Sequence, residues 1–152
     1  MAVIAGRARS DDEGRATFAK LDPGVYQVTV RRKNASAVAF RVFDVRAGAT
    51  ARAELVVLPG SFTLTLTDFA TGDPSVGVSV MARAIADLEG RALADERVVE
   101  TAKTDDRGVA LLEGLAPARY QVWVTGPKRS AESAEVVVRP GEASDAGSLT
   151  IR

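Results

Sequence analysis

A stretch of 21 residues occurs twice in this chain and decides its expected fold. Residues Ser10–Val30 read SDDEGRATFAKLDPGVYQVTV, and residues Thr104–Val124 read TDDRGVALLEGLAPARYQVWV. Each residue pairs with one 94 positions later, without a gap, and 10 of the 21 pairs are identical. Such repetition indicates that one structural unit is built twice. The identical pairs are Asp11/Asp105, Asp12/Asp106, Gly14/Gly108, Ala16/Ala110, Leu21/Leu115, Pro23/Pro117, Tyr26/Tyr120, Gln27/Gln121, Val28/Val122 and Val30/Val124.

Each copy begins with a predicted tight turn. Two aspartates precede a glycine, Gly14 or Gly108. Aspartate side chains accept hydrogen bonds from nearby backbone N–H groups, and glycine accepts a positive φ. A short apolar strand is expected next, and it ends near Pro23 or Pro117 because proline cannot donate to a β-ladder.

The second half of each copy predicts a half-buried strand. Apolar residues alternate with polar ones in Tyr-Gln-Val-x-Val, so that Tyr26 and Val28 share a face, as do Tyr120 and Val122. A tyrosine just after a proline resembles the tyrosine corner of β-sandwiches, in which the hydroxyl bonds to backbone upstream.

The rest of the chain also reads as short strands separated by turns, which is typical of an all-β sandwich. Pro59-Gly60 marks the expected boundary between a unit at 1–59 and a unit at 60–152. In the first unit we expect strands at 1–9, 37–45 and 53–58, with Val56 and Leu58 facing inward. In the second we expect strands at 61–67, 76–80, 98–101, 135–138 and around Leu149 and Ile151. The region 81–103 is expected to contain a long loop with one helical turn.

Composition excludes several classes of function. The 20 basic and 20 acidic residues balance, which argues against a nucleic-acid or anionic-membrane partner. Histidine and cysteine are absent, so the chain has no Ser-His-Asp triad, no cysteine nucleophile, no disulfide and no thiolate zinc site. No apolar run approaches the ~20 residues that span a bilayer. We therefore expect no enzyme activity, no cofactor and no membrane insertion. No signal peptide is visible in this chain.

Three motifs of the second unit resemble the carboxypeptidase regulatory-like domain, a transthyretin-like seven-stranded sandwich. They are D-x-x-T-G-x-P-x-x-G-V-x-V at 68–80, T-D-x-x-G at 104–108 and L-x-P-x-x-Y-x-V-x-V at 115–124. The resemblance covers 61–152, and the first unit has only the later part of the pattern. Ala118 stands where the family usually has glycine, whereas Gly24 keeps it. The resemblance implies tandem Ig-like, transthyretin-like Greek-key sandwiches in a secreted, periplasmic or surface protein, acting as a spacer, adhesion or accessory module.

Two ligand hypotheses stay open at this point. Trp123 alternates out of phase with Tyr120 and Val122, so it can stack on a sugar as part of a carbohydrate-binding module. It can equally pack under the 81–103 connection or against the first unit. The paired aspartates of the acidic turns are also candidate calcium ligands, although such turns are common for their geometry alone.

The first unit is too short to be a complete sandwich. Only nine residues precede its acidic turn region, 1–9, and it lacks a counterpart to 61–67 and to most of 76–80. A missing strand leaves a sheet edge unpaired. We expect the gap to be filled by a strand of a neighbouring chain, which implies assembly by strand addition, or by the 59–80 region packing across both units. A further possibility is that the chain is part of a longer protein.

Overall fold

The computed structural model describes residues 5–33, 37–94, 99–125 and 133–152, and within these ranges the chain is all-β. No helix long and apolar enough to cross a membrane occurs among them. Expectations for 1–4 and for 95–98 lie outside the described residues. Residues 95–98 are part of the loop expected at 81–103 and include the first residue of the strand expected at 98–101. The strands are β1 (Gly24–Arg31), β2 (Ala37–Val45), β3 (Gly60–Asp68), β4 (Ser79–Ala86), β5 (Val99–Lys103), β6 (Val109–Leu115), β7 (Ala118–Thr125), β8 (Ala134–Val138) and β9 (Ala143–Ile151).

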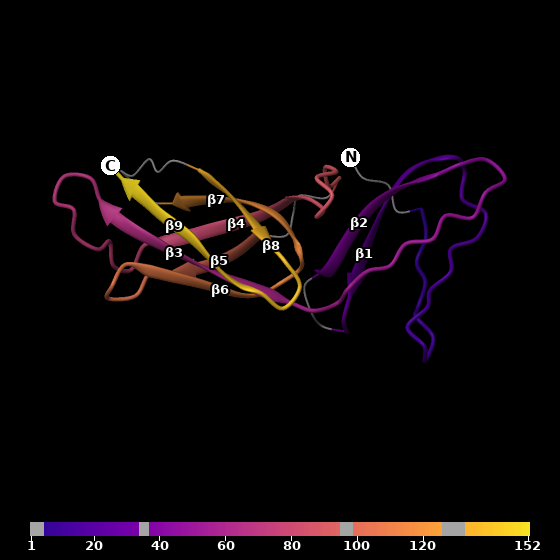
Figure 1. Cartoon of the computed structure of the whole chain (residues 1–152), viewed down its shortest axis with the longest axis horizontal. Helices are drawn as coiled ribbons and strands as arrows, with labels where there is room; N and C mark the ends of the chain where they lie inside the picture. Colours follow the sequence, from indigo (N-terminus) through magenta and orange to yellow (C-terminus); the bar gives the residue numbers. More distant parts are fainter. Residues whose placement is uncertain (1–4, 34–36, 95–98, 126–132) are drawn as a thin grey trace.

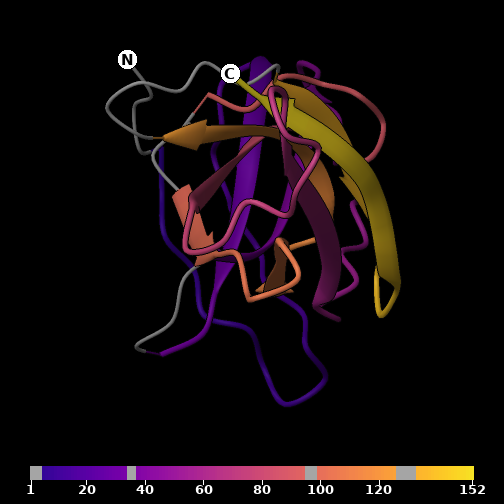
Figure 2. The same cartoon turned by 90° about the vertical axis from the view of Figure 1, so that its left-hand side faces the viewer.

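Seven of these strands form an Ig-like β-sandwich. One sheet has the order β6-β3-β9 and the other has the order β5-β4-β7-β8. In the first sheet β3 pairs antiparallel with β6 and parallel with β9. The other sheet is antiparallel throughout. The two layers are seen in Figure 2, which views the molecule along its long axis.

Alternation places the core between the two layers. Phe62, Leu64 and Leu66 of β3 are buried, and the threonines between them are half-buried. Leu149 and Ile151 of β9 are also buried and belong to the same core cluster. The predicted faces of these two strands are therefore correct, as period-two patterning requires when one face of a sheet is covered.

The strand that follows β3 lies further along the chain than expected. β4 spans Ser79–Ala86, whereas residue 76 is in a turn and the Val76 side chain is 58% exposed. The inward positions of β4 after Val80 are Ala82, Ala84 and Ala86. Alanine is rare in strands and favours helices, so local preference pointed to a loop with a helical turn. Pairing on both sides with β5 and β7 overrides that preference.

The chain before Pro59 contains a two-stranded ribbon. β1 and β2 pair antiparallel and form a sheet of their own, with Gln27 opposite Val42. Phe40 and Val42 are nonetheless buried and join the core cluster of the sandwich. Figure 1 shows the sandwich at one end of an elongated molecule, the ribbon next to it, and the strand-free segments 5–23 and 46–59 at the other end.

Three strands expected in the first unit are wrong. Residues 5–9, 15–21 and 51–59 belong to no strand. Val56 and Leu58, expected to face inward, are 55% and 51% exposed. The 59–80 region does not add a strand to the ribbon, because β3 is held between β6 and β9. These segments have strand-like sequences, but a strand needs a ladder partner and none is described beside them.

Candidate functional site

The acidic turns of the repeat have the same hydrogen bonds in both copies. In the first, the Arg15 N–H donates to Asp11 Oδ1 at 2.8 Å, and the Gly14 N–H donates to the Asp11 carbonyl at 3.0 Å. In the second, Val109 and Gly108 make the equivalent bonds at 2.9 and 3.0 Å. Both glycines have positive φ, 77° and 74°. The carboxylates of Asp11 and Asp105 therefore accept hydrogen bonds from the backbone of their own turns and stabilise them.

The neighbouring aspartates, Asp12 and Asp106, are exposed and are not gathered with other ligands. In the described part of the chain, no group of three or more acidic side chains is placed to hold a metal ion. The hydrogen bond from the Val109 N–H is the main cause that lowers the pKa of the Asp105 carboxyl below its ordinary 3.8. Desolvation opposes it in part, and the hydrogen bond from the Arg107 N–H lowers the pKa further.

Both tyrosines of the repeat form corners. Tyr120 Oη donates to the Ala116 carbonyl at 2.8 Å, and Tyr26 Oη donates to the Asp22 carbonyl at 2.8 Å. Pro117 and Pro23 lie directly after these acceptors. Tyr120 is 1% exposed, whereas Tyr26 is half-buried. Burial, followed by the charge of Glu100, raises the pKa of the Tyr120 phenol. The corner motif is thus engaged in folding contacts rather than open to a ligand.

A third turn of the same type joins the ribbon to the sandwich. Asp87-Leu88-Glu89-Gly90 follows β4, and Asp87 Oδ1 accepts the Arg91 N–H at 2.8 Å while the Gly90 N–H donates to the Asp87 carbonyl at 3.0 Å. Unlike the other two aspartates, Asp87 is fully buried. Its Oδ2 accepts the Val42 N–H of β2 at 2.9 Å.

Further polar contacts surround Asp87. The Arg91 guanidinium binds Asp44 with two nitrogens, at 3.1 and 3.2 Å, and Nη1 also donates to the Val42 carbonyl at 3.3 Å. The Ala94 N–H donates to Gln27 Oε1 at 2.6 Å. Both strands of the ribbon are therefore hydrogen-bonded to the 87–94 segment. Sequence reasoning missed this contact, although the Asp-x-x-Gly spacing that it shares with the repeat was a usable signal.

Trp123 lies on the outer face of the four-stranded sheet. It is opposite Met81 in the β4–β7 ladder and is half-buried. The Arg83 guanidinium carbon lies 5.8 Å from the Trp123 ring centroid, and Arg83 Nη2 donates to Gln121 Oε1 at 3.1 Å. Arg83, Gln121 and Trp123 line a hollow of about 250 Å³. We call these three residues the Trp123 face.

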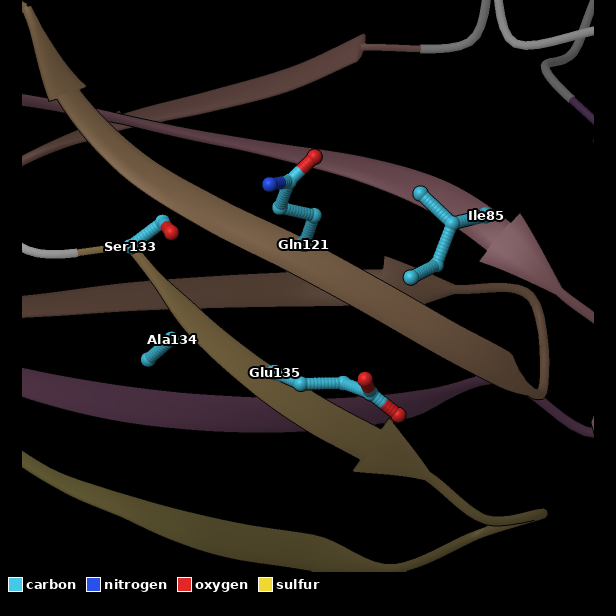
Figure 3. A pocket seen from close by; sticks show the side chains of 5 residues that line it. All are labelled: Ile85, Gln121, Ser133, Ala134 and Glu135. Atoms are coloured by element: carbon cyan, nitrogen blue, oxygen red, sulfur yellow. The ribbon is translucent and has the colours of Figure 1, made fainter.

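A second hollow of similar size, about 250 Å³, adjoins it on the same sheet. Figure 3 shows Gln121 of β7, Ile85 of β4 and Glu135 of β8 around it, together with Ser133 and Ala134 at the start of β8. Gln121 lines both hollows. The outer face thus combines an indole ring, an amide group and a carboxylate group along two adjoining hollows.

Comparison with known proteins yields distant structural likenesses. No protein-family model and no curated protein matches the chain. A minor pilin of Streptococcus agalactiae is 18% identical over 94% of this chain and 66% of its own, with a TM-score of 0.48. The major pilin SpaD of Corynebacterium diphtheriae is 19% identical over 60% of this chain and 30% of its own, at 0.45. The TIE protein of Bacillus anthracis is 18% identical over 94% and 28%, at 0.43.

The chain thus spans between 28% and 66% of the length of these proteins. Likeness at this level assigns neither a family nor a function.

Proposed function

We propose that the chain is a non-catalytic structural or interaction module of a larger secreted or surface-exposed protein or assembly. In this proposal it consists of two transthyretin-like units in tandem, the first incomplete, and it serves as a spacer or accessory part. The matching turns and corners of the two copies support a common unit. Their chemically capable groups, Asp11, Asp105, Tyr26 and Tyr120, are hydrogen-bonded to their own backbone.

The observation that carries the spacer role is the buried contact at Asp87. A buried carboxylate is tolerated only when hydrogen bonds compensate for its lost hydration. Asp87 obtains them from both sides of the junction, from Arg91 in the sandwich and from Val42 in the ribbon. Separating the two parts would break this hydrogen bond and leave both Asp87 Oδ2 and the Val42 N–H without the partner they have in the folded chain. The contact therefore opposes bending between them, which is the property that a spacer requires.

Rotational tumbling measured by ¹⁵N relaxation tests this role. The wild-type ribbon and sandwich should tumble with one correlation time. Asp87→Ala removes the shared acceptor, so the ribbon should tumble faster than the sandwich. Asp105→Ala is the matched control, because it removes the same carboxylate from the same type of turn away from the junction. Independent tumbling in the wild-type chain would contradict the spacer role.

The alternative function is carbohydrate binding through the Trp123 face. The half-buried Trp123 indole lies beside Gln121 in a hollow of about 250 Å³. This arrangement supports sugar binding, because the apolar ring can stack on a sugar while a neighbouring polar group forms hydrogen bonds. Glycan-array or affinity-gel binding that is present in wild type and lost in Trp123→Ala would support it. A Phe69→Ala variant is the control, since Phe69 is also exposed, at 61%, but lies in the turn after β3. Absence of glycan binding by the wild-type chain would contradict this alternative.

A further inference from the structure

The outer edge of β2 is closed at its centre by two side chains of the 87–91 turn. The Val42 N–H donates to Asp87 Oδ2 at 2.9 Å, and the Val42 carbonyl accepts from Arg91 Nη1 at 3.3 Å. Both backbone groups of Val42 therefore point away from β1. In an antiparallel sheet, a residue exchanges these same two bonds with the residue opposite it on the next strand. Asp87 and Arg91 thus occupy the place of one residue of a further strand.

The two side chains match this edge because of their hydrogen-bonding chemistry. A carboxylate only accepts hydrogen bonds and a guanidinium only donates them, so the pair satisfies one N–H and one carbonyl. Further contacts position the turn along β2. The Arg91 guanidinium binds Asp44 with two nitrogens, and Arg41 Nη1 lies 3.2 Å from Glu89 Oε1. The turn therefore contacts β2 at Arg41, Val42 and Asp44.

The same five-residue motif occurs a second time in the chain, at an exposed position. Residues 11–15 read DDEGR and residues 87–91 read DLEGR. In the exposed copy, Arg15 Nε donates to Asp11 Oδ2 at 3.3 Å, so the arginine bonds to its own aspartate. In the other copy, Asp87 Oδ2 and the Arg91 guanidinium bond to β2 instead. The turn forms in both settings, so its contact with β2 is not a requirement of its own geometry.

Without this turn, β2 would be a strand edge well suited to pairing. Its nine residues are rich in β-branched and aromatic side chains, which favour strands; these are Val38, Phe40, Val42, Phe43 and Val45. In the described part of the chain, β1 and β2 form a two-stranded sheet of their own. A two-stranded ribbon is marginally stable and gains from additional strands. A long edge of this kind is one that proteins commonly cover with a loop.

The second copy of the repeat protects the equivalent edge in a different way. β2 corresponds to β8, since Val45-Arg46-Ala47-Gly48 matches Val138-Arg139-Pro140-Gly141. β8 is the outermost strand of its sheet, so the outer side of β2 is a sheet edge in either copy. β8 has only five residues, and Glu135 stands where β2 has Val42. Short strands and charged side chains both discourage edge pairing. β2 is longer and apolar at this position, and there the 87–91 turn covers the edge.

We propose that the 87–91 turn is an edge cap that prevents two copies of this chain from pairing through β2. Without the cap, Val42 of one copy pairs with Val42 of the second about a two-fold axis, and residues 39–45 of both copies form one antiparallel ladder. The two outward groups of Val42 suit such a pair, and an identical strand is self-complementary about a two-fold axis. The product is a four-stranded sheet with the order β1-β2-β2-β1. The inference goes beyond the proposed spacer role, because it gives Asp87 and Arg91 control over self-association.

The double variant Asp87→Ala/Arg91→Ala tests the cap by light scattering and hydrogen exchange over a range of chain concentrations. As the concentration rises, the average mass should increase from that of one chain toward that of two. The Val42 amide should exchange rapidly in the dilute variant and about tenfold or more slowly once pairs form, because a ladder amide exchanges only when its strand opens. The Phe43 amide faces β1 and should stay protected throughout. The wild-type chain should stay monomeric, with slow exchange of the Val42 amide at every concentration.

The matched control is Asp11→Ala/Arg15→Ala. It removes the same two side chains from the exposed DDEGR turn and should behave as the wild type does. Asp87→Asn is a second, milder variant for the case that the Phe43 amide loses its protection in the double variant. Its single amide oxygen replaces the two oxygens that accept from Arg91 and Val42, so the turn should persist while the edge opens. This variant should also show concentration-dependent protection of the Val42 amide.

Three results would overturn the proposal. Variants with a protected Phe43 amide that stay monomeric at every concentration would show that the cap does not control association. Association that leaves the Val42 amide in rapid exchange would place the contact on another surface. Protection of the Val42 amide that rises with concentration in the wild-type chain would show that the edge is already open.

The cap and the spacer role can fail separately. The relaxation measurement of Asp87→Ala is made at the dilute end of the same concentration series, where the variant is monomeric. A ribbon that tumbles separately there but does not pair at high concentration refutes the cap alone. A ribbon that keeps the correlation time of the sandwich in the monomer, yet pairs when concentrated, refutes the spacer role alone.

Discussion

The two copies of the repeat make the same local hydrogen bonds in very different surroundings. The corner bond is 2.8 Å long in both, yet Tyr120 is 1% exposed while Tyr26 is only half-buried. The turn glycines have nearly the same φ, yet only one is enclosed by other elements. Local chemistry therefore builds the motif in either setting. How much the motif stabilises the fold depends on the layer that covers it.

The turn glycines should give the largest difference between the copies. A Cβ on Gly108 would lie 2.6 Å from the Leu66 carbonyl oxygen, whereas a Cβ on Gly14 would meet nothing within 4 Å. Both substitutions to alanine incur the cost of a positive φ, about 1 kcal/mol. Gly108→Ala also displaces backbone, so we expect a total loss of about 3 kcal/mol. Urea denaturation followed by Trp123 fluorescence measures the loss for Gly108→Ala.

The control for that measurement is Gly14→Ala, whose effect is read from hydrogen exchange of the β1–β2 amides. Equal losses for the two variants would show that the enclosure of Gly108 by Leu66 and Pro74 has no energetic consequence.

The corner tyrosines should differ by a smaller amount. Tyr120→Phe leaves the buried Ala116 carbonyl without its donor, which typically costs about 1–3 kcal/mol. Tyr26→Phe frees the Asp22 carbonyl at an exposed position, where water can replace the hydroxyl, so the cost should be below about 0.5 kcal/mol. The midpoints of chemical unfolding and the exchange of β1 amides measure the two effects. An unchanged midpoint for Tyr120→Phe would show that this bond does not stabilise the sandwich.

Alkaline pH should lower the stability of the wild-type sandwich through ionisation of Tyr120. Its phenol has a pKa raised above the ordinary 10.0 because burial, and then Glu100, disfavour the phenolate. The unfolded chain therefore releases this proton at a lower pH than the folded chain. The stabilisation is fully present below pH 10.0 and is lost as pH rises above that value. Unfolding titrations between about pH 9 and 12 should show a decline. The decline should be smaller in Tyr120→Phe, and an identical decline in both proteins would contradict the assignment to Tyr120.

The acidic turn should give the smallest effect. The pKa of Asp105 is lowered by the Val109 N–H and then by the Arg107 N–H and guanidinium. A lowered pKa means that the unfolded chain takes up this proton first as pH falls. The contribution of the carboxylate is present above pH 3.8 and declines below it. Asp105→Asn should therefore flatten the acid limb of the stability profile, measured by thermal unfolding between about pH 2 and 5. A steeper acid limb in the variant would contradict this sign.

Sequence alone was sufficient for features whose bonds join residues two to four positions apart. The acidic turns need only an aspartate and a glycine at the right spacing, and the corners need only a tyrosine four residues after an acceptor carbonyl. Strands such as β2 and β3 were also predictable, because their period-two pattern survives without knowledge of the partner. The all-β class follows from these elements together.

Tertiary structure decided the features that depend on partners distant in sequence. The alanines of β4 form a strand because β5 and β7 flank it, whereas 51–58 has better strand residues and no ladder. Asp87 resembles Asp11 and Asp105 in its turn, yet it alone of the three bonds across to β2, 45 residues away. Local sequence specifies the hydrogen bonds that a segment can close by itself. Burial and pairing are set by which segments fold against it, and those contacts span the whole chain.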